Sequence, residues 1–175
     1  MHVAALVGSS GSGKTTLIEA LLGQFAARGL RASVIKHAHH GFELDRPGKD
    51  SWRHRKAGAC EVLVASPHLL ALQRETREAR EYDPAELLPL LQPVDWVLVE
   101  GYKHAALPKI EVWRAANARP TMLDGDPLRL ALACDGQAPP GTTVPLLDLR
   151  EPSRIADWMI EHARLFAYAD ATSRS

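Results

Sequence analysis

Eight residues near the start of the chain have the types and spacing of a phosphate-binding loop. Residues 8–15 read Gly-Ser-Ser-Gly-Ser-Gly-Lys-Thr, which is the pattern G-x-x-x-x-G-K-T. Successive backbone N–H groups of such a loop surround a phosphate, Lys14 reaches the β- and γ-phosphates, and the Thr15 hydroxyl ligates Mg²⁺. The residues predicted to bind the nucleotide here are Gly8, Gly11, Ser12, Gly13, Lys14, Thr15 and Thr16.

A phosphate-binding loop also needs an acid at the end of a neighbouring parallel strand, where it holds Mg²⁺ or its waters. Glu100 ends the apolar run Asp95–Glu100, and Gly101 follows as a turn residue that leaves room for a ligand. Glu100 is therefore the predicted metal acid. The alternative is an acid at a strand end that only faces solvent.

A second loop, residues 45–51, reads Asp-Arg-Pro-Gly-Lys-Asp-Ser. Residues 36–56 carry six lysines and arginines against three acids, a local excess of positive charge on a chain of zero net charge, which suits an anionic ligand. Pro47, Gly48, Lys49 and Asp50 are predicted to contact the nucleotide, and Asp45 is a second candidate acid for Mg²⁺. The alternative is a surface loop in which Asp50 or Ser51 caps the following helix.

Two further segments carry polar groups with weaker patterns. Lys36-His37-Ala38-His39-His40 contains imidazoles, but no cysteine or carboxylate at zinc-site spacing accompanies them, so a polar lining near the phosphates is favoured over a metal site. Ala133-Cys134-Asp135 is the only partial analogue of the guanine-reading motif N-K-x-D, which the chain lacks. An aspartate that starts a loop is the favoured interpretation of Asp135.

The segments that must position these residues alternate between strands and helices. Strands are expected at 3–7, 31–36, 61–66, 95–100, 109–114, 130–134 and 144–147. Helices are expected at 17–25, 51–57, 84–91 and 152–166. Residues 69–76 would pair back on 61–66 through a turn at Pro67-His68. The pattern predicts an α/β fold, with one nucleotide-binding domain over residues 1–167 and a disordered tail at 168–175 that frays from Ala167 onward.

Composition narrows the class of protein. Lysine plus arginine and aspartate plus glutamate both number 21, which argues against a general nucleic-acid or membrane-surface binder. No apolar run approaches the ~18 residues of a membrane span, and no signal peptide is visible. Cys60 and Cys134 lie in apolar contexts and are expected to be buried free thiols rather than a disulfide. A cytoplasmic protein is expected.

Taken together, five segments give the chain a specific likeness. They are residues 8–16, the histidine segment 35–40, the loop 45–51, Arg-Lys-Ala-Gly-Ala at 55–59, and Val-Glu-Gly-Tyr-Lys-His at 99–104. The chain resembles the molybdopterin-guanine dinucleotide biosynthesis protein B (MobB) family from about Val3 to Glu161. It departs from the family pattern at 74–82, and from Ala115 onward the likeness is one of outline.

This resemblance implies a P-loop NTPase with three α/β/α layers, a mostly parallel doubly wound sheet and an extended β-hairpin arm, here formed by residues 67–76. It implies a homodimer that binds GTP and hydrolyses it weakly. The partner would be the MobA-type guanylyltransferase that joins GMP to molybdopterin, and molybdopterin itself is a further candidate ligand. Gly11 to Thr15 and Pro47 to Asp50 would bind the nucleotide, and Glu100 would serve Mg²⁺.

The residues predict slow hydrolysis because no catalytic base or arginine finger is evident, so the catalytic residues are unknown. A basic side chain from a partner could supply the missing charge, and Arg46, Lys49 and Arg53 are the candidates. Two other functions stay open: a small-molecule kinase that uses the same loop, and an adapter that binds nucleotide only to gate a partner.

Overall fold

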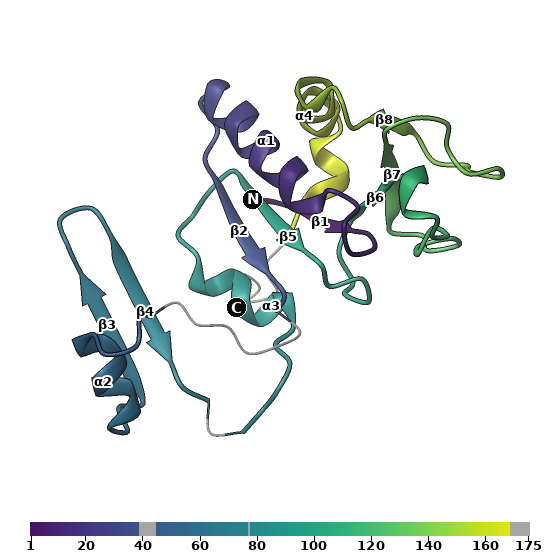
Figure 1. Ribbon diagram of the computed structural model, residues 1–175. Coiled ribbons are helices and arrows are strands. Elements are labelled where there is room, and N and C mark those ends of the chain that lie inside the picture. Colours follow the sequence, from purple (N-terminus) through teal and green to yellow (C-terminus); the bar gives the residue numbers. More distant parts are fainter. Residues whose placement is uncertain (39–44, 77, 169–175) are drawn as a thin grey trace, which may run out of the picture. The chain divides into compact units, whose positions relative to one another are not determined.

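The chain forms two compact units (Figure 1). Residues 1–38, 45–76 and 78–168 are described in this computed structural model. Unit 1 comprises residues 1–37 and 83–175, and unit 2 comprises residues 38–82, so unit 2 is an insertion within the sequence of unit 1. The single domain over residues 1–167 stays a prediction.

Unit 1 contains a six-stranded sheet in the order β2-β5-β1-β6-β7-β8. Its strands are β1 (His2–Val7), β2 (Ala32–Lys36), β5 (Trp96–Glu100), β6 (Lys109–Trp113), β7 (Arg129–Cys134) and β8 (Leu146–Asp148). All five strand pairings are parallel. Parallel strands with both faces covered read as continuous apolar runs. That property let the sequence indicate β1, β5 and β7, and the predicted α/β fold is confirmed.

The two faces of this sheet pack against different helical segments. Ala4 and Leu6 of β1 face one apolar cluster, whereas Val3, Ala5 and Val7 face the other. The first cluster includes side chains of α1 (Lys14–Ala27), α4 (Pro152–Glu161) and the 3₁₀ turn η3 (Ala163–Phe166), and Figure 1 shows α1 and α4 side by side. The second includes Leu88, from the segment formed by α3 (Pro84–Leu87) and η1 (Leu88–Leu90). Another short turn, η2 (Ala115–Asn117), follows β6.

The two later helices are shorter than expected. The helix predicted at 84–91 is α only as far as Leu87, because Pro89 has no N–H to donate and the chain tightens into the 3₁₀ turn. The last helix ends at Glu161, and η3 then buries Phe166 with its ring edge against Trp96. Backbone pairing continues beyond it: Ala167 bridges His2, and the Tyr168 N–H donates to the Met1 carbonyl. The expectation that the chain frays from Ala167 was wrong there, and residues 169–175 lie outside the described residues.

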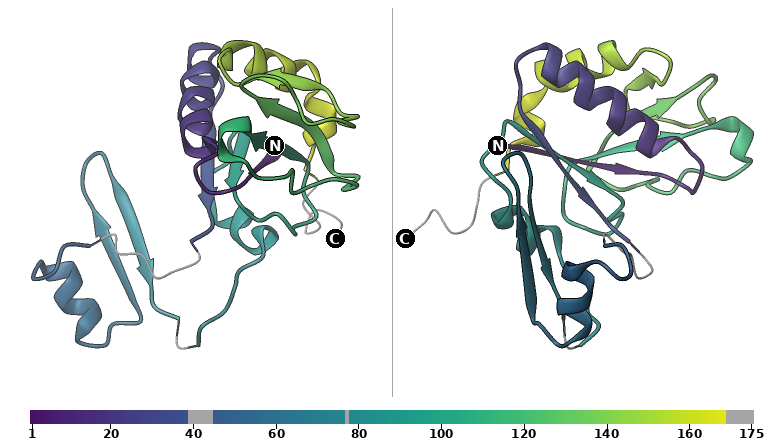
Figure 2. Two further views of the ribbon diagram at one scale, coloured as in Figure 1. Left: turned by 45° about the vertical axis from the view of Figure 1, so that its right-hand side comes forward. Right: turned by 60° about the vertical axis from the view of Figure 1, so that its left-hand side comes forward.

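Unit 2 consists of the helix α2 (Asp50–Lys56) and the antiparallel pair β3 (Glu61–Ala65) and β4 (Leu70–Arg74). Figure 2 shows β3 and β4 as paired strands in both views. The Ser66 N–H donates to the Leu69 carbonyl at 2.8 Å, which closes the predicted turn at Pro67-His68. No described residue of this unit is buried. Large aliphatic side chains are exposed instead, namely Leu63, Val64, Leu69, Leu70 and Leu72.

Both cysteines are free thiols, as expected, but they differ in burial. Cys134 is buried at the end of β7, where its Sγ contacts the Gly136 carbonyl oxygen at 3.3 Å. Cys60 is exposed, which corrects the expectation of two buried thiols, because it precedes β3 in the unit without a core. Among the described helices, none is long and apolar enough to span a membrane.

Candidate functional site

The loop between β1 and α1 has the backbone form that phosphate binding requires. Gly13 caps α1 in the left-handed region at φ 95°, where other residues are strained. A Cβ on Gly8 would clash with the Val112 carbonyl oxygen and lie 2.7 Å from Ser12 Oγ. The Ser12 side chain is fully buried, and its hydroxyl has no hydrogen-bond partner among the described residues. The loop thus has a close-packed base and a polar group without a partner, which fits an anionic ligand.

Lys14 folds back over this loop. Its ammonium donates to the carbonyl oxygens of Gly8 and Ser9, each at 2.9 Å. Burial lowers the pKa of Lys14, the negative charge of Glu100 partly offsets that effect, and the positive charge of Lys36 adds to it. A phosphate on the loop would replace the two carbonyl partners with a full negative charge. The position of Lys14 therefore fits its predicted role.

Thr15 and Glu100 meet at the carboxyl ends of β1 and β5. The Thr15 hydroxyl donates to Glu100 Oε1 at 2.8 Å, and Lys36 Nζ lies 3.4 Å from the second oxygen, Oε2. The strand register sets this meeting, because Lys36 and Leu6 both lie opposite Glu100 in the sheet. A hydroxyl and a carboxylate in contact are oxygen ligands of the kind that Mg²⁺ takes alongside phosphate oxygens. The residues present fit that cation.

The turn after Glu100 brings the histidine segment to the same edge of the sheet. Gly101 has φ 94° and Tyr102 φ 55°, and a Cβ on Gly101 would lie 3.2 Å from the His37 Cβ. The His37 and Tyr102 rings lie 4.6 Å apart. His39 and His40 lie outside the described residues. Within the described residues, no group of three or more histidines, cysteines or acids could hold a metal, and the polar lining that the sequence favoured stays a prediction.

Arg114 also lies at the phosphate-binding loop, although it was not among the residues predicted from the sequence. It follows β6, and its Nε donates to the Ser12 carbonyl oxygen at 3.1 Å. Its Nη1 lies 3.5 Å from Asp135 Oδ2, and its guanidinium lies against Gly13. Asn117 also reaches the loop, with Nδ2 3.5 Å from Ser9 Oγ. The rule that identified Glu100, a polar residue at the carboxyl end of a buried strand, applies equally to Arg114 and would have found it.

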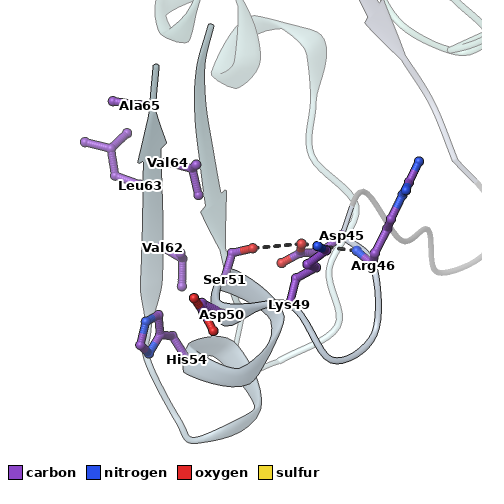
Figure 3. A pocket seen from close by; sticks show the side chains of 10 residues that line it. All are labelled: Asp45, Arg46, Lys49, Asp50, Ser51, His54, Val62, Leu63, Val64 and Ala65. Atoms are coloured by element: carbon purple, nitrogen blue, oxygen red, sulfur yellow. Dashed lines mark hydrogen bonds between the residues drawn. The ribbon is translucent and has the colours of Figure 1, made fainter. Parts of the chain in front are cut away.

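The predicted residues of the second loop belong to unit 2, where Asp45, Lys49 and Asp50, but not Pro47 or Gly48, line a cavity of about 610 Å³ (Figure 3). Asp45 Oδ1 accepts hydrogen bonds from the Ser51 hydroxyl at 2.8 Å and from the Arg46 N–H at 3.1 Å. Asp45 Oδ2 is buried without a described partner. The cavity lining comprises Asp45, Arg46, Lys49, Asp50, Ser51, His54 and the residues 62–65 of β3.

The alternative in which Asp50 or Ser51 caps the following helix was wrong, because neither residue occupies the N-cap position. Lys49 occupies the N-cap position of α2, Asp50 is the first helical residue, and no side chain caps the helix. Gly48 has φ 87°, the left-handed conformation of a turn. Asp50 contacts Arg53 at 3.6 Å, and both side chains are exposed. The predicted nucleotide residues thus fall into two sets, Gly8–Thr16 with Glu100 in unit 1, and 45–50 in unit 2. Their union in one site stays a prediction.

Comparisons with known proteins agree on one family. The family model described as "Molybdopterin guanine dinucleotide synthesis protein B" (MobB) matches residues 3–135. The molybdopterin-guanine dinucleotide biosynthesis adapter protein of Escherichia coli is 41% identical over 160 residues, which is 90% of each chain. That of Haemophilus influenzae is 39% identical over 159 residues, 88% of this chain and 85% of its own length.

Solved structures give the same answer at the level of the fold. A crystal structure of Bacillus subtilis MobB has a TM-score of 0.72 at 27% identity, covering 93% of this chain and 98% of that one. A MobB homologue from Bacillus stearothermophilus has a TM-score of 0.67 at 25% identity, covering 94% and 99%. With the matched family model and relatives along most of the chain, this protein belongs to the MobB family.

Proposed function

We propose that this protein binds GTP with Mg²⁺ and acts as an adapter in the synthesis of molybdopterin guanine dinucleotide. The observation that carries nucleotide binding is the Thr15–Glu100 contact beside the Lys14 ammonium, at a loop of the required pattern. The role in the pathway is supported by the relatives, which are named adapter proteins of that synthesis. Guanine is the base of the dinucleotide in those names, which favours GTP.

Each residue has a distinct task in the proposed complex. The N–H groups of residues 9–15 hold the phosphates at the start of α1, where the helix dipole adds positive charge. Lys14 leaves the carbonyl oxygens of Gly8 and Ser9 and binds the β- and γ-phosphates. Thr15 and Glu100 would hold Mg²⁺, which would neutralise charge on the phosphate oxygens. Arg46 and Lys49 in the loop 45–50 of unit 2 carry further positive charge of the kind that suits an anionic ligand.

Hydrolysis by this protein alone is expected to be slow. The two carboxylate oxygens of Glu100 already contact Thr15 and Lys36, so we assign Glu100 to the cation and not to proton transfer. An added positive charge is worth about 10³–10⁵ in rate for GTPases. We propose that a partner protein or a second copy supplies it, with Arg46, Lys49 and Arg53 as the candidates within this chain. If single alanine variants of all three residues hydrolyse GTP at the normal rate, none of the three supplies the catalytic charge.

Calorimetric titration tests the nucleotide site. The wild type should bind GTP more tightly than ATP, and more tightly with Mg²⁺ than without it. Lys14→Ala should weaken GTP binding at least tenfold, since a charge-assisted contact to phosphate is worth about 1.5–3 kcal/mol. Glu100→Gln should remove most of the Mg²⁺ dependence. Arg154→Ala removes an exposed positive charge on α4 and should change neither. A wild type that binds no nucleotide would refute the proposal.

The same preparation separates the two other functions. A small-molecule kinase should prefer ATP and consume it faster when an acceptor is added. A nucleotide-gated adapter should capture the MobA-type guanylyltransferase differently with GTP, with GDP and without nucleotide. We expect GTP to change the amount of guanylyltransferase captured while GTP hydrolysis stays slow. We also propose that the protein acts in the cytoplasm. Equal capture in all three states would eliminate gating by nucleotide. Titration with molybdopterin tests it as a further ligand.

We also propose that a second copy of the chain covers the hairpin. Leu63 and Leu72 lie opposite one another on β3 and β4, and Leu70 lies on the same face. These three side chains are 52–68% exposed, and an isolated two-stranded pair is marginally stable. Sedimentation should show a dimer for the wild type and a monomer for Leu72→Lys. Leu165→Lys, at an exposed leucine of unit 1, should stay dimeric. A monomeric wild type would overturn this part.

A further inference from the structure

Polar side chains lie on both sides of β1 at the carboxyl end of the sheet, and the two groups differ in kind. Toward β5 and β2 lie Thr15 and Glu100, the pair that fits Mg²⁺, and beside them the Lys36 ammonium. Toward β6 and β7 lie Arg114 and Asp135, which form an ion pair. Ligands of parallel α/β sheets bind beyond the carboxyl ends of the strands, so both groups border the ligand position.

The proposed function sets the direction of the nucleotide between these groups. A cation held by Thr15 and Glu100 would neutralise charge on the terminal phosphates. The terminal phosphates therefore lie on the β5 side, beside Lys36, whose positive charge suits them. The nucleoside must then leave the loop on the other side, over β6 and β7. Arg114 and Asp135 stand at the ends of those two strands.

Arg114 ties Asp135 to the phosphate-binding loop. One edge of its planar guanidinium donates from Nε to the Ser12 carbonyl at 3.1 Å, and Nη1 lies 3.5 Å from Asp135 Oδ2. The Arg114 guanidinium therefore lies between the Asp135 carboxylate and the loop and contacts both. The Asp135 side chain is 27% exposed, and no described residue donates a hydrogen bond to it. Its oxygens therefore retain free acceptor sites.

We infer that Asp135, positioned by Arg114, reads the base of the bound nucleotide; this rests on the proposed GTP-binding function. Guanine presents two adjacent donors, N1–H and the N2 amino group, and a carboxylate presents two acceptors side by side. Adenine has an acceptor at N1, which the carboxylate repels. Asp135 thus selects guanine over adenine, and Arg114 keeps the carboxylate facing the ligand. If the Arg114–Asp135 ion pair had only a structural role, it would contribute little to stability, because both side chains are partly exposed.

The test exchanges donors and acceptors on both molecules. Asp135→Asn presents one acceptor and one donor, which match the N1–H and the C2 carbonyl of xanthine. Calorimetry with GTP, XTP and ATP in Mg²⁺ should show a roughly 10- to 100-fold loss of GTP affinity and a gain of at least tenfold for XTP, as expected for hydrogen bonds to a charged group. Asp157→Asn is the matched control, since it breaks the Arg28–Asp157 pair on α4. Thermal unfolding checks that both variants fold.

Each outcome decides the inference. A reversed preference for XTP in Asp135→Asn, with GTP still preferred by Asp157→Asn, supports it. Loss of GTP affinity without gain for XTP in a folded variant overturns it, as does an unchanged preference. Wild type that binds neither GTP nor XTP overturns the nucleotide function itself. Arg114→Ala should bring the GTP-to-XTP affinity ratio toward one without reversing it, a change that loss of loop rigidity alone would not produce.

Discussion

The two compact units of this protein bury their apolar residues to very different degrees. Val3, Phe25 and Leu98 in unit 1 are fully buried, whereas in unit 2 Leu63 and Leu70 are 61% and 68% exposed. A six-stranded sheet with helices on both faces can bury such residues, but a helix and two strands cannot. Unit 1 therefore stabilises its phosphate-binding loop by itself. Unit 2 displays its apolar side chains for something outside its own fold to cover.

Hydrogen exchange should show the largest difference between the units. Amides of β1 and β5 should exchange only through global unfolding, with protection of about 5 kcal/mol or more. Amides of β3 and β4 in dilute monomeric protein should exchange through local opening at little cost. Exchange is measured by mass spectrometry at several protein concentrations. Equal protection in the monomer would show that unit 2 is as stable as unit 1 and would remove the contrast.

Truncation of one apolar side chain in each unit tests the same contrast. Phe25→Ala opens a cavity beside Trp96 and should lower the free energy of unfolding by about 4 kcal/mol. Leu70→Ala should change it by less than about 0.5 kcal/mol in the monomer, because the side chain is already in water. Urea unfolding followed by circular dichroism measures both. A Leu70→Ala cost that appears only at high concentration would point to coverage by a second copy.

Ion pairs should repeat the pattern at a smaller scale. Arg129→Met leaves the buried Glu111 carboxylate without its partner and should cost about 3 kcal/mol, since buried charges are expensive when unpaired. Arg74→Met breaks the exposed pair with Glu61 in unit 2 and should cost under about 1 kcal/mol. Replacement of both Glu111 and Arg129 by leucine and methionine should recover part of the loss. Equal costs for the two arginines would contradict the burial argument.

The smallest predicted effect is a pH dependence within unit 1. Burial raises the pKa of Glu111 above its ordinary value of 4.5, although hydrogen bonding from Met122 and the charge of Arg129 oppose this. The folded protein holds this proton more tightly than the unfolded chain. Stability from Glu111 is therefore complete below pH 4.5 and declines as pH rises through the folded value.

Comparison with a non-ionising variant isolates that effect. The free energy of unfolding of the wild type minus that of Glu111→Gln should decrease as pH rises above 4.5. Urea titrations across that range measure it. The same difference taken with Leu165→Ala, an exposed and non-titrating position, should not change with pH. An increase with pH would mean that Arg129 outweighs burial and that the pKa is lowered.

Much of the fold and half of the candidate site could be predicted from the sequence. The β-strands with continuous apolar runs were found because both of their faces are buried, and Gly8–Thr15 was found because its pattern is local. Glu100 was proposed from its place at the end of such a strand, and its role stays a prediction. Arg114 also follows a buried strand, but its contact with Ser12 spans 102 positions and depends on β6 lying next to β1, so only the tertiary structure shows it. The prediction that Cys60 is buried was wrong, because apolar neighbours in the sequence do not guarantee a hydrophobic core around a residue.

The sequence by itself determined the elements and the phosphate-binding loop, because each depends on residues close together in the chain. It also determined the family likeness, because that likeness is the sum of five such local segments. Tertiary structure decided which side chains meet. Parallel pairing of β1 with β5 placed Thr15 against Glu100, and pairing of β1 with β6 and of β6 with β7 placed Arg114 between the loop and Asp135. Strand order is chosen by the packing of the whole sheet against its helices, and no local pattern encodes it.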